Sequence, residues 1–189
     1  PGSKIVLFVG RLVREKGAEV LVRAAPQVLT EAPDTQFLIA GRGPELDRLQ
    51  RLVEAMSVQH RVRLLGFVDD DTRDRLYVAA DCAVFPSLYE PFGIVALEAM
   101  AARTPVVVSE VGGLAEIVEH GETGITVYPD DPASCAWGII HTLEQPQWAQ
   151  QRVENAYRVV TTRYNWDTIA EQTEAVYTRV AAERQLADW

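Results

Sequence analysis

Residues 82–108 read CAVFPSLYEPFGIVALEAMAARTPVVV, which is a short apolar run, a polar turn, an apolar helical segment and a second apolar run. The two runs, Cys82–Phe85 and Val106–Val108, are typical of strands that are buried on both faces of a sheet. The segment between them, from about Phe92 to Ala102, is long enough for a helix that crosses over to a parallel strand. This stretch therefore predicts one strand–helix–strand unit of a parallel sheet.

The same alternation of apolar runs and helical patterns extends in both directions along the chain. We expect further strands at Ile5–Val9, Phe37–Ala40, Val62–Leu65 and Ile125–Val127, and helices at about Ala18–Leu29, Glu45–Met56, Asp71–Ala80, Leu114–Glu119 and Ala133–Leu143. Strands rich in Val, Ile and Leu, each followed by a helix, predict an α/β fold with a Rossmann-like, doubly wound parallel sheet. Two more helices are expected at about 148–163 and 167–186. No repeat or linker interrupts residues 1–189, so we expect one domain, with its core at about 4–145 and C-terminal helices at about 148–187.

The composition excludes several classes of protein. The 189 residues are 48% hydrophobic and 24% charged, which is a globular composition. No apolar run approaches the roughly 18 residues that cross a bilayer, and no charged leader precedes an apolar stretch, so we expect neither a membrane span nor secretion. Cys82 and Cys135 stand far apart, without disulfide or metal-site spacing, which favours a cytoplasmic location.

The net charge of -9 argues against nucleic-acid binding, which usually requires a basic face. The charge is also uneven: residues 1–75 hold 12 Lys and Arg against 11 Asp and Glu, whereas residues 76–189 hold 6 against 16. A bound anion is therefore expected among the early residues. The three histidines, His60, His120 and His141, have no ligand spacing, so no metal is expected.

Unusual residues gather in the strand-to-helix turns, where open parallel sheets bind their ligands. The first turn, Gly10–Gly17, combines glycines with Arg11, Arg14 and Lys16 but lacks both the GxGxxG and the GxxxxGK[ST] pattern. Arginine as a planar fork and lysine as a mobile point charge suit a diphosphate. Taken alone, this turn is equally compatible with a solvated basic loop.

Two glutamates mark the fourth turn and its helix. Glu98 is the one charged residue of an apolar helix, where an ionised carboxylate needs a partner, and Arg103 is a candidate. Glu90 precedes the expected helix start, whose free N–H groups favour an anion. Eight helical positions separate two carboxylates by about 12 Å along the axis, which is too far for the acid and nucleophile of a retaining glycosidase. We expect Glu90 and Glu98 to contact two parts of one extended ligand.

The string Glu90-Pro-Phe-Gly-Ile-Val-Ala-Leu-Glu98 resembles the E-x7-E signature of retaining GT-B glycosyltransferases, above all family 4. Residues 8–17, FVGRLVREKG, resemble the phosphate-binding loop of that family. Other motifs in the family's order are LIAGRGP at 38–44, VRLLGFV at 62–68, VFPS at 84–87 and TPVVVS at 104–109 followed by Gly112-Gly113, and the tail around Tyr164-Asn-Trp166 is similar too. The resemblance implies the C-terminal, donor-binding half of a GT-B enzyme.

The resemblance also implies roles for individual residues. Arg11 and Lys16 would hold the diphosphate of a nucleotide sugar and neutralise the leaving group, and Glu90 would contact the sugar, which makes these three the expected catalytic residues. The expected donor-binding residues are Gly10, Arg11, Lys16, Phe67, Glu90, Phe92, Gly93, Ile94 and Glu98. In this set Glu98 would take the ribose hydroxyls and Phe67 would lie along the base. No cofactor and no metal are implied, because the nucleotide sugar is itself the substrate.

The resemblance leaves the N-terminal, acceptor-binding domain of the family outside this chain, so we expect donor binding without transfer. An apolar stripe on the last helix, which in the family crosses back toward that domain, would be exposed: Trp166, Ile169, Thr173, Val176, Tyr177 and Val180. A GT-B epimerase or phosphorylase, or a non-catalytic nucleotide-sugar binding module, are alternatives. The base, the sugar and the acceptor stay open.

Weaker features are interpreted as structural. Asp69-Asp70-Asp71 suits a helix N-terminus, and Gly41–Pro44 suits a tight turn from which Arg42 could reach the ligand-binding edge. Trp137 and Trp148 are interpreted as packing residues.

Overall fold

The computed structural model of the protein describes residues 2–186. Its strands are β1 (Lys4–Val9), β2 (Thr35–Ala40), β3 (Val62–Gly66), β4 (Cys82–Phe85), β5 (Val106–Ser109) and β6 (Ile125–Val127). Its helices are η1 (Arg14–Lys16, a 3-10 turn), α1 (Ala18–Glu31), α2 (Leu46–Ala55), α3 (Asp70–Ala79), α4 (Ile94–Ala101), α5 (Gly112–Ile117), α6 (Pro132–Glu144), α7 (Pro146–Arg163) and α8 (Trp166–Leu186). The predicted order of strands and helices is confirmed.

The strands form one six-stranded parallel sheet in the order β3-β2-β1-β4-β5-β6. The chain first winds outward from β1 to β3 and then returns to lay β4 beside β1. The direction of winding reverses between β1 and β4, and ligands of such sheets bind at this switch point. The predicted doubly wound α/β sheet is confirmed, and its topology brings the turns after β1 and β4 together.

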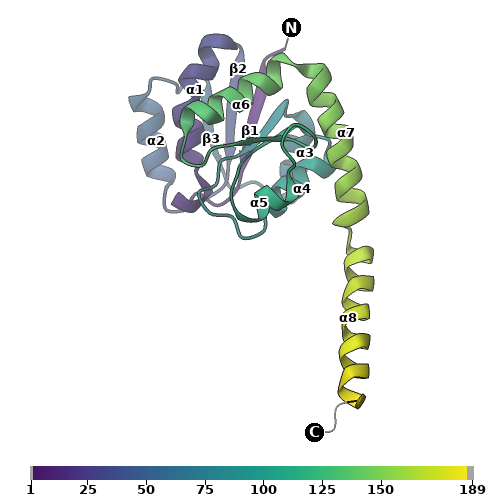
Figure 1. The fold of residues 1–189 in the computed structure, drawn as a ribbon. Helices are drawn as coiled ribbons and strands as arrows, with labels where there is room; N and C mark the ends of the chain where they lie inside the picture. The colour runs from purple at the N-terminus through teal and green to yellow at the C-terminus, as the bar shows by residue number, and fades with distance from the viewer. Residues whose placement is uncertain (1, 187–189) are drawn as a thin grey trace.

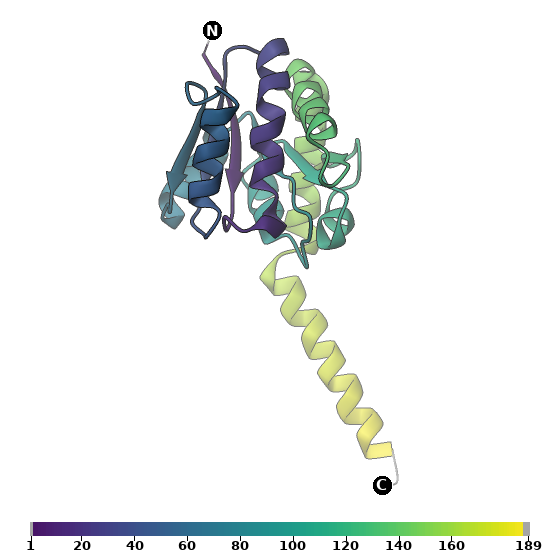
Figure 2. The same ribbon diagram turned by 90° about the vertical axis from the view of Figure 1, so that its left-hand side faces the viewer.

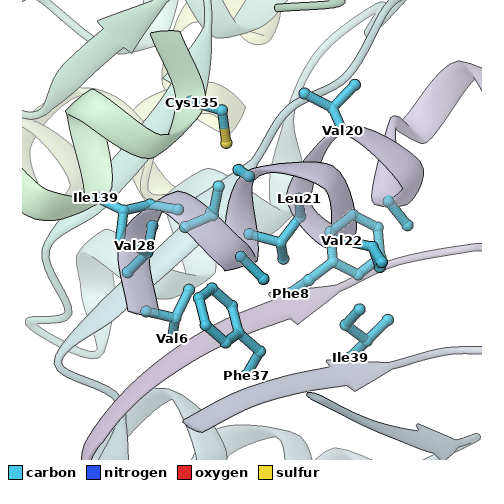
Figure 3. Close-up of a cluster of buried hydrophobic side chains, with 14 of the residues drawn as sticks. Val6, Phe8, Val20, Leu21, Val22, Val28, Phe37, Ile39, Cys135 and Ile139 are labelled. Carbon is cyan, nitrogen blue, oxygen red and sulfur yellow. The ribbon is translucent and has the colours of Figure 1, made fainter. Parts of the chain in front are cut away.

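Successive side chains of β1 point to opposite faces of the sheet. Val6 and Phe8 are buried under α1, α2 and α6, whereas Leu7 is buried under α3, α4, α5 and α7. Figure 3 shows the first of these two cores, in which Phe8 and Phe37 of the sheet face Leu21 of α1. Helices therefore cover both faces of the sheet, as Figures 1 and 2 show.

Helix α8 extends away from the layered body in both views (Figures 1 and 2). Most of its apolar stripe is exposed to solvent, including Trp166 at 84%, Tyr177 at 70% and Val180 at 52%. The predicted exposure is confirmed for these residues, whereas Ile169 is half-buried. None of the described helices has both the length and the apolar character that a membrane crossing needs.

Candidate functional site

The loops after β1 and β4 are joined into one unit at the switch point. The carbonyl of Glu15 accepts hydrogen bonds from the N–H groups of Leu88, at 2.7 Å, and Tyr89, at 3.2 Å. Gly17 has φ 67°, and a Cβ added there would lie 1.8 Å from the carbonyl oxygen of Pro86. Only glycine permits both this backbone conformation and this close approach. The conformation of the first loop therefore positions the loop that carries Glu90.

Lys16 and Glu90 form an ion pair in which the ammonium donates to Oε2 of the carboxylate. Glu90 is only 5% exposed, and the hydroxyl of Ser87 lies 3.4 Å from the same oxygen as a second donor. An ionised carboxylate at such depth needs a charged partner, since a buried unpaired charge is strongly destabilising. Lys16 and Glu90, which were predicted as site residues in two different turns, are thus in direct contact.

The loop after β5 holds Glu90 from the other side. The N–H of Gly113 donates to the carbonyl of Glu90 at 2.9 Å. A Cβ at Gly112 would lie 2.2 Å from that carbonyl oxygen, and a Cβ at Gly113 would lie 2.1 Å from the carbonyl oxygen of Phe92. The hydroxyl of Ser109 also donates to the carbonyl of Ser87. Three loops therefore fix the position of Glu90.

Helix α4 begins later than predicted. The expected start near Phe92 is wrong, because Gly93 has φ 100° and the helix begins at Ile94. Glu90 thus lies in the loop, and the helical spacing of 12 Å between Glu90 and Glu98 does not apply. Within the described residues, the N–H groups of Phe92, Gly93 and Ile94 donate none of the hydrogen bonds found. These free donors beside Glu90 are the groups that bind an anion at a helix start.

Glu98 pairs with residues of α3 rather than with the expected Arg103. The hydroxyl of Tyr77 donates to Glu98 at 3.2 Å, and the Arg73 guanidinium lies 3.5 Å from its other oxygen. Arg103 instead pairs with Glu154 on α7, at 2.6 Å. Burial raises the pKa of the Glu98 carboxyl, and the positive charge of Arg73 opposes that shift only in part. Since Arg73 lies in the first turn of α3, Glu98 is placed at the carboxyl edge of the sheet.

The turn after β2 is hydrogen-bonded to the first loop and places Arg42 at the edge of the site. Leu12 exchanges backbone hydrogen bonds with this turn, donating to Arg42 at 2.9 Å and accepting from Glu45 at 3.0 Å. The Arg42 guanidinium lies 4.7 Å from the ring centre of Phe67, in the turn after β3. Phe67 is 65% exposed, so its ring is available to a ligand.

Arg11 and Arg14 are exposed in the first loop. Among the described residues neither has an ion-pair partner, in contrast to Lys16. Gly10, which precedes Arg11, donates its N–H to the carbonyl of Ala40 at 3.0 Å. The loop therefore presents exposed arginines, unpaired within residues 2–186, next to the ion pair of Lys16 and Glu90, which suits an anionic ligand.

Three site residues were missed from the sequence: Ser87, Arg73 and Tyr77. Arg73 and Tyr77 are four residues apart on α3 and so share one face, which was a usable signal. Asp69 caps α3 by accepting from the N–H of Thr72 at 2.8 Å, as predicted. The interpretation of Trp148 as a packing residue is wrong, because it is 60% exposed. For Trp137 it is confirmed in part, because this side chain stacks on His120 and His141 but is 48% exposed.

Metal ligands do not gather in the described part of the chain: residues 2–186 contain no group of three His, Cys, Asp or Glu side chains that could hold a metal ion. The site consists instead of fixed backbone donors, cations and carboxylates. These groups can bind a phosphate at one end and hydroxyls at the other.

Comparison with known families gives one match that covers most of the chain. The family described as "Glycosyl transferases group 1" matches residues 1–159. An uncharacterized glycosyltransferase of Methanocaldococcus jannaschii is 51% identical over 96% of this chain and 46% of its own length. A glycogen synthase of Mycobacterium tuberculosis is 40% identical over 97% of this chain and 44% of its own length. The chain spans about half the length of the curated relatives it matches.

Solved structures show the same fold. Sucrose-phosphate synthase from Thermosynechococcus elongatus superposes with a TM-score of 0.87 at 39% identity, over 96% of this chain and 46% of that one. Anabaena HepE, in complex with UDP-glucose, gives 0.86 at 29% identity, over 94% of this chain and 49% of its own. The C-terminal domain of a glycosyl transferase group 1 protein from Francisella tularensis gives 0.79 at 28% identity, over 88% of both chains.

Proposed function

Because the chain belongs to the glycosyl transferases group 1 family, we propose that it binds the nucleotide-sugar donor of a retaining glycosyltransferase. The observation that carries the proposal is the contact of Lys16 with the buried Glu90, beside the free N–H groups that precede α4. Support also comes from HepE, whose structure contains UDP-glucose. The Francisella structure, described as a C-terminal domain, supports a donor half that follows an acceptor half.

The donor would lie along the carboxyl edge of the sheet. Lys16, Arg11 and the N–H groups of Phe92, Gly93 and Ile94 would bind the diphosphate, since cations and a helix start both favour phosphate. Glu90 would accept hydrogen bonds from the sugar hydroxyls. Its ion pair with Lys16 would keep the carboxylate charged and link the sugar site to the phosphate site.

The proposed reaction replaces the bond from the anomeric carbon to the diphosphate with a bond to an acceptor hydroxyl on the same face. The leaving diphosphate oxygen would take the proton of the acceptor, and Lys16 and Arg11 would neutralise the remaining charge. The catalytic residues would then be Arg11, Lys16 and Glu90. Positioning and charge neutralisation would supply most of the rate.

We propose that Glu98 accepts hydrogen bonds from the ribose hydroxyls. Its pKa is raised above the usual 4.5 by burial. Protonation, which removes the charge and makes one oxygen a donor, would therefore weaken this acceptor at a higher pH than for an exposed glutamate. Affinity for UDP should therefore decrease as the pH falls toward 5. The variant Glu98→Gln should bind UDP more weakly than the parent protein at neutral pH, and its affinity should no longer depend on pH in this range. Calorimetry from pH 5 to 8 measures the effect, with inorganic pyrophosphate, which lacks ribose, as the control ligand. An unchanged pH profile in Glu98→Gln would contradict the assignment.

The base would stack on Phe67, whose exposed ring carries the Arg42 guanidinium on one side. Phe67→Ala should weaken binding of UDP by about tenfold, since stacking on an aromatic ring contributes roughly 1–3 kcal/mol per base. Binding of pyrophosphate should stay the same. Arg42→Ala should give a smaller loss. Equal losses of affinity for UDP and for pyrophosphate in Phe67→Ala would contradict the assignment of Phe67 to the base.

The acceptor half would dock against the exposed stripe of α8. That stripe includes Trp166, Val176, Tyr177 and Val180, and within the described residues nothing covers it. The present chain would therefore bind the donor but not transfer the sugar. Joining it to the N-terminal half of the Methanocaldococcus jannaschii relative, which is 51% identical, should restore transfer.

The joined protein tests the reaction. With a nucleotide sugar and an acceptor, NMR of the product should show the anomeric configuration of the donor retained, and Glu90→Gln should abolish the product. Inverted configuration would contradict the retaining mechanism. Sugar-nucleotide binding without any transfer by the joined protein would favour the alternative of a non-catalytic binding module.

A further inference from the structure

A second groove lies at the end of the sheet, outside the residues assigned to the donor. It has a volume of about 610 Å³ and runs between the end of edge strand β6 and the first turns of α6. Its lining includes Glu110, His120, Tyr128, Asp131, Ser134 and Trp137. The groove begins near the donor site, because Glu110 is two residues from Gly112, which packs on the carbonyl of Glu90.

Trp137 and His120 form the aromatic wall of the groove. The Trp137 ring stacks on His120, at a ring distance of 6.3 Å and an angle of 12°, and on His141, outside the lining, at 5.2 Å and 21°. The His120 ring is fixed, because its Nδ1 accepts from the N–H of Thr126 at 3.1 Å. Burial lowers the pKa of His141, and the nearby positive charge of Arg152 adds to this shift. Trp137 is nevertheless 48% exposed, so the part of its indole ring that the two imidazoles leave uncovered is open to a ligand.

The polar groups of the groove are acceptors and hydroxyls. Glu110 is exposed and has no ion-pair partner among the described residues. Asp131 caps α6 with Oδ1 alone, accepting from Ala133 at 2.9 Å and Ser134 at 3.0 Å, so Oδ2 is available. Tyr128 adds an exposed phenol. No lysine or arginine is among the described residues of the lining, which disfavours phosphate or any other anion.

A ligand of this groove must combine a flat apolar face with hydroxyl donors and carry no negative charge. Neutral oligosaccharides have this chemistry: the C–H face of a pyranose lies on an aromatic ring while its hydroxyls donate to carboxylates. We propose that the groove binds a neutral oligosaccharide, as a subsite for the part of a glycan acceptor remote from the reacting hydroxyl. The acceptor role rests on the proposed function, whereas oligosaccharide binding does not. A second copy of this chain, packed through Trp137, is the competing occupant.

The test is a titration of the chain with maltoheptaose and with cellohexaose, followed by NMR of the indole N–H signals. We expect binding with a Kd on the order of 1 mM, with movement of the Trp137 signal and not of the Trp148 signal. Trp148 is 60% exposed on α7 and lies outside the groove, so Trp148→Ala is a matched control. Trp137→Ala should weaken binding by about tenfold or more, and Trp148→Ala should leave it unchanged.

The possible outcomes distinguish failure of the oligosaccharide groove from failure of the proposed donor site. If neither oligosaccharide binds, or if both variants bind equally, the glycan groove is refuted while UDP-glucose binding still reports on the donor site. If sedimentation shows self-association that Trp137→Ala abolishes and the sugars do not disturb, the groove is an interface between copies. If the oligosaccharide binds as expected but no nucleotide sugar binds, the proposed donor function is refuted and the assignment of the groove to an oligosaccharide is supported.

Discussion

Replacement of Lys16 by alanine is expected to reduce nucleotide-sugar binding by at least about 100-fold, equivalent to about 2.7 kcal/mol. It should also lower the free energy of unfolding by about 3 kcal/mol, the lower end for breaking a buried ion pair. The reason for both effects is the contact with Glu90, which is 5% exposed and would be left as an unpaired buried carboxylate. Calorimetry measures the first effect and urea denaturation the second.

A double variant separates the two roles of Lys16. Glu90→Gln added to Lys16→Ala removes the unpaired charge, so most of the lost stability should return while binding stays weak. Lys16→Arg, which keeps the charge, should retain part of the binding. If Lys16→Ala lowered stability without changing binding, Lys16 would be a structural residue and its assignment to the diphosphate would be wrong.

Replacement of Gly17 by alanine is expected to destabilise the protein by about 3 kcal/mol or more, and to weaken donor binding. The new Cβ would lie 1.8 Å from the carbonyl oxygen of Pro86 at a backbone φ of 67°, so steric overlap adds to the cost of about 1–3 kcal/mol for a left-handed non-glycine residue. Relief of the overlap must move the loop that carries Glu90. Thermal unfolding and a UDP titration measure the two consequences.

Gly121 provides a matched control for this change. It has φ 80°, and a Cβ there would meet nothing within 4 Å. Gly121→Ala should therefore show the conformational cost alone and leave UDP binding intact. If both variants lost the same stability and neither lost binding, the contact between the first and fourth loops would have no role in the site.

The local sequence was sufficient to predict the sheet. Each strand is a short Val-, Ile- or Leu-rich run and each crossing helix has its own periodicity, so the alternation predicts a parallel arrangement. The contact of Lys16 with Glu90 follows from the topology, because the turns after β1 and β4 meet at the switch point. The roles of these residues came from the resemblance to a family rather than from spacing.

Other features depend on tertiary contacts that periodicity does not contain. Glu98 pairs with Arg73 and Tyr77 because α3 packs beside α4, whereas sequence distance alone suggested Arg103. The start of α4 is delayed by the positive φ of Gly93, where an added Cβ would lie 2.9 Å from the Leu114 side chain. A large apolar side chain such as Trp137 is expected to be buried, but it is 48% exposed, because it lies beside the edge strand β6.

The most direct test of the account is a calorimetric titration of the chain with UDP-, ADP- and GDP-glucose, alongside a variant that combines Arg11→Ala and Lys16→Ala. We predict that at least one of the three nucleotide sugars binds and that the double variant abolishes this binding. Absence of binding to all three, or equal binding to both proteins, would contradict the assignment of the site to a nucleotide-sugar donor.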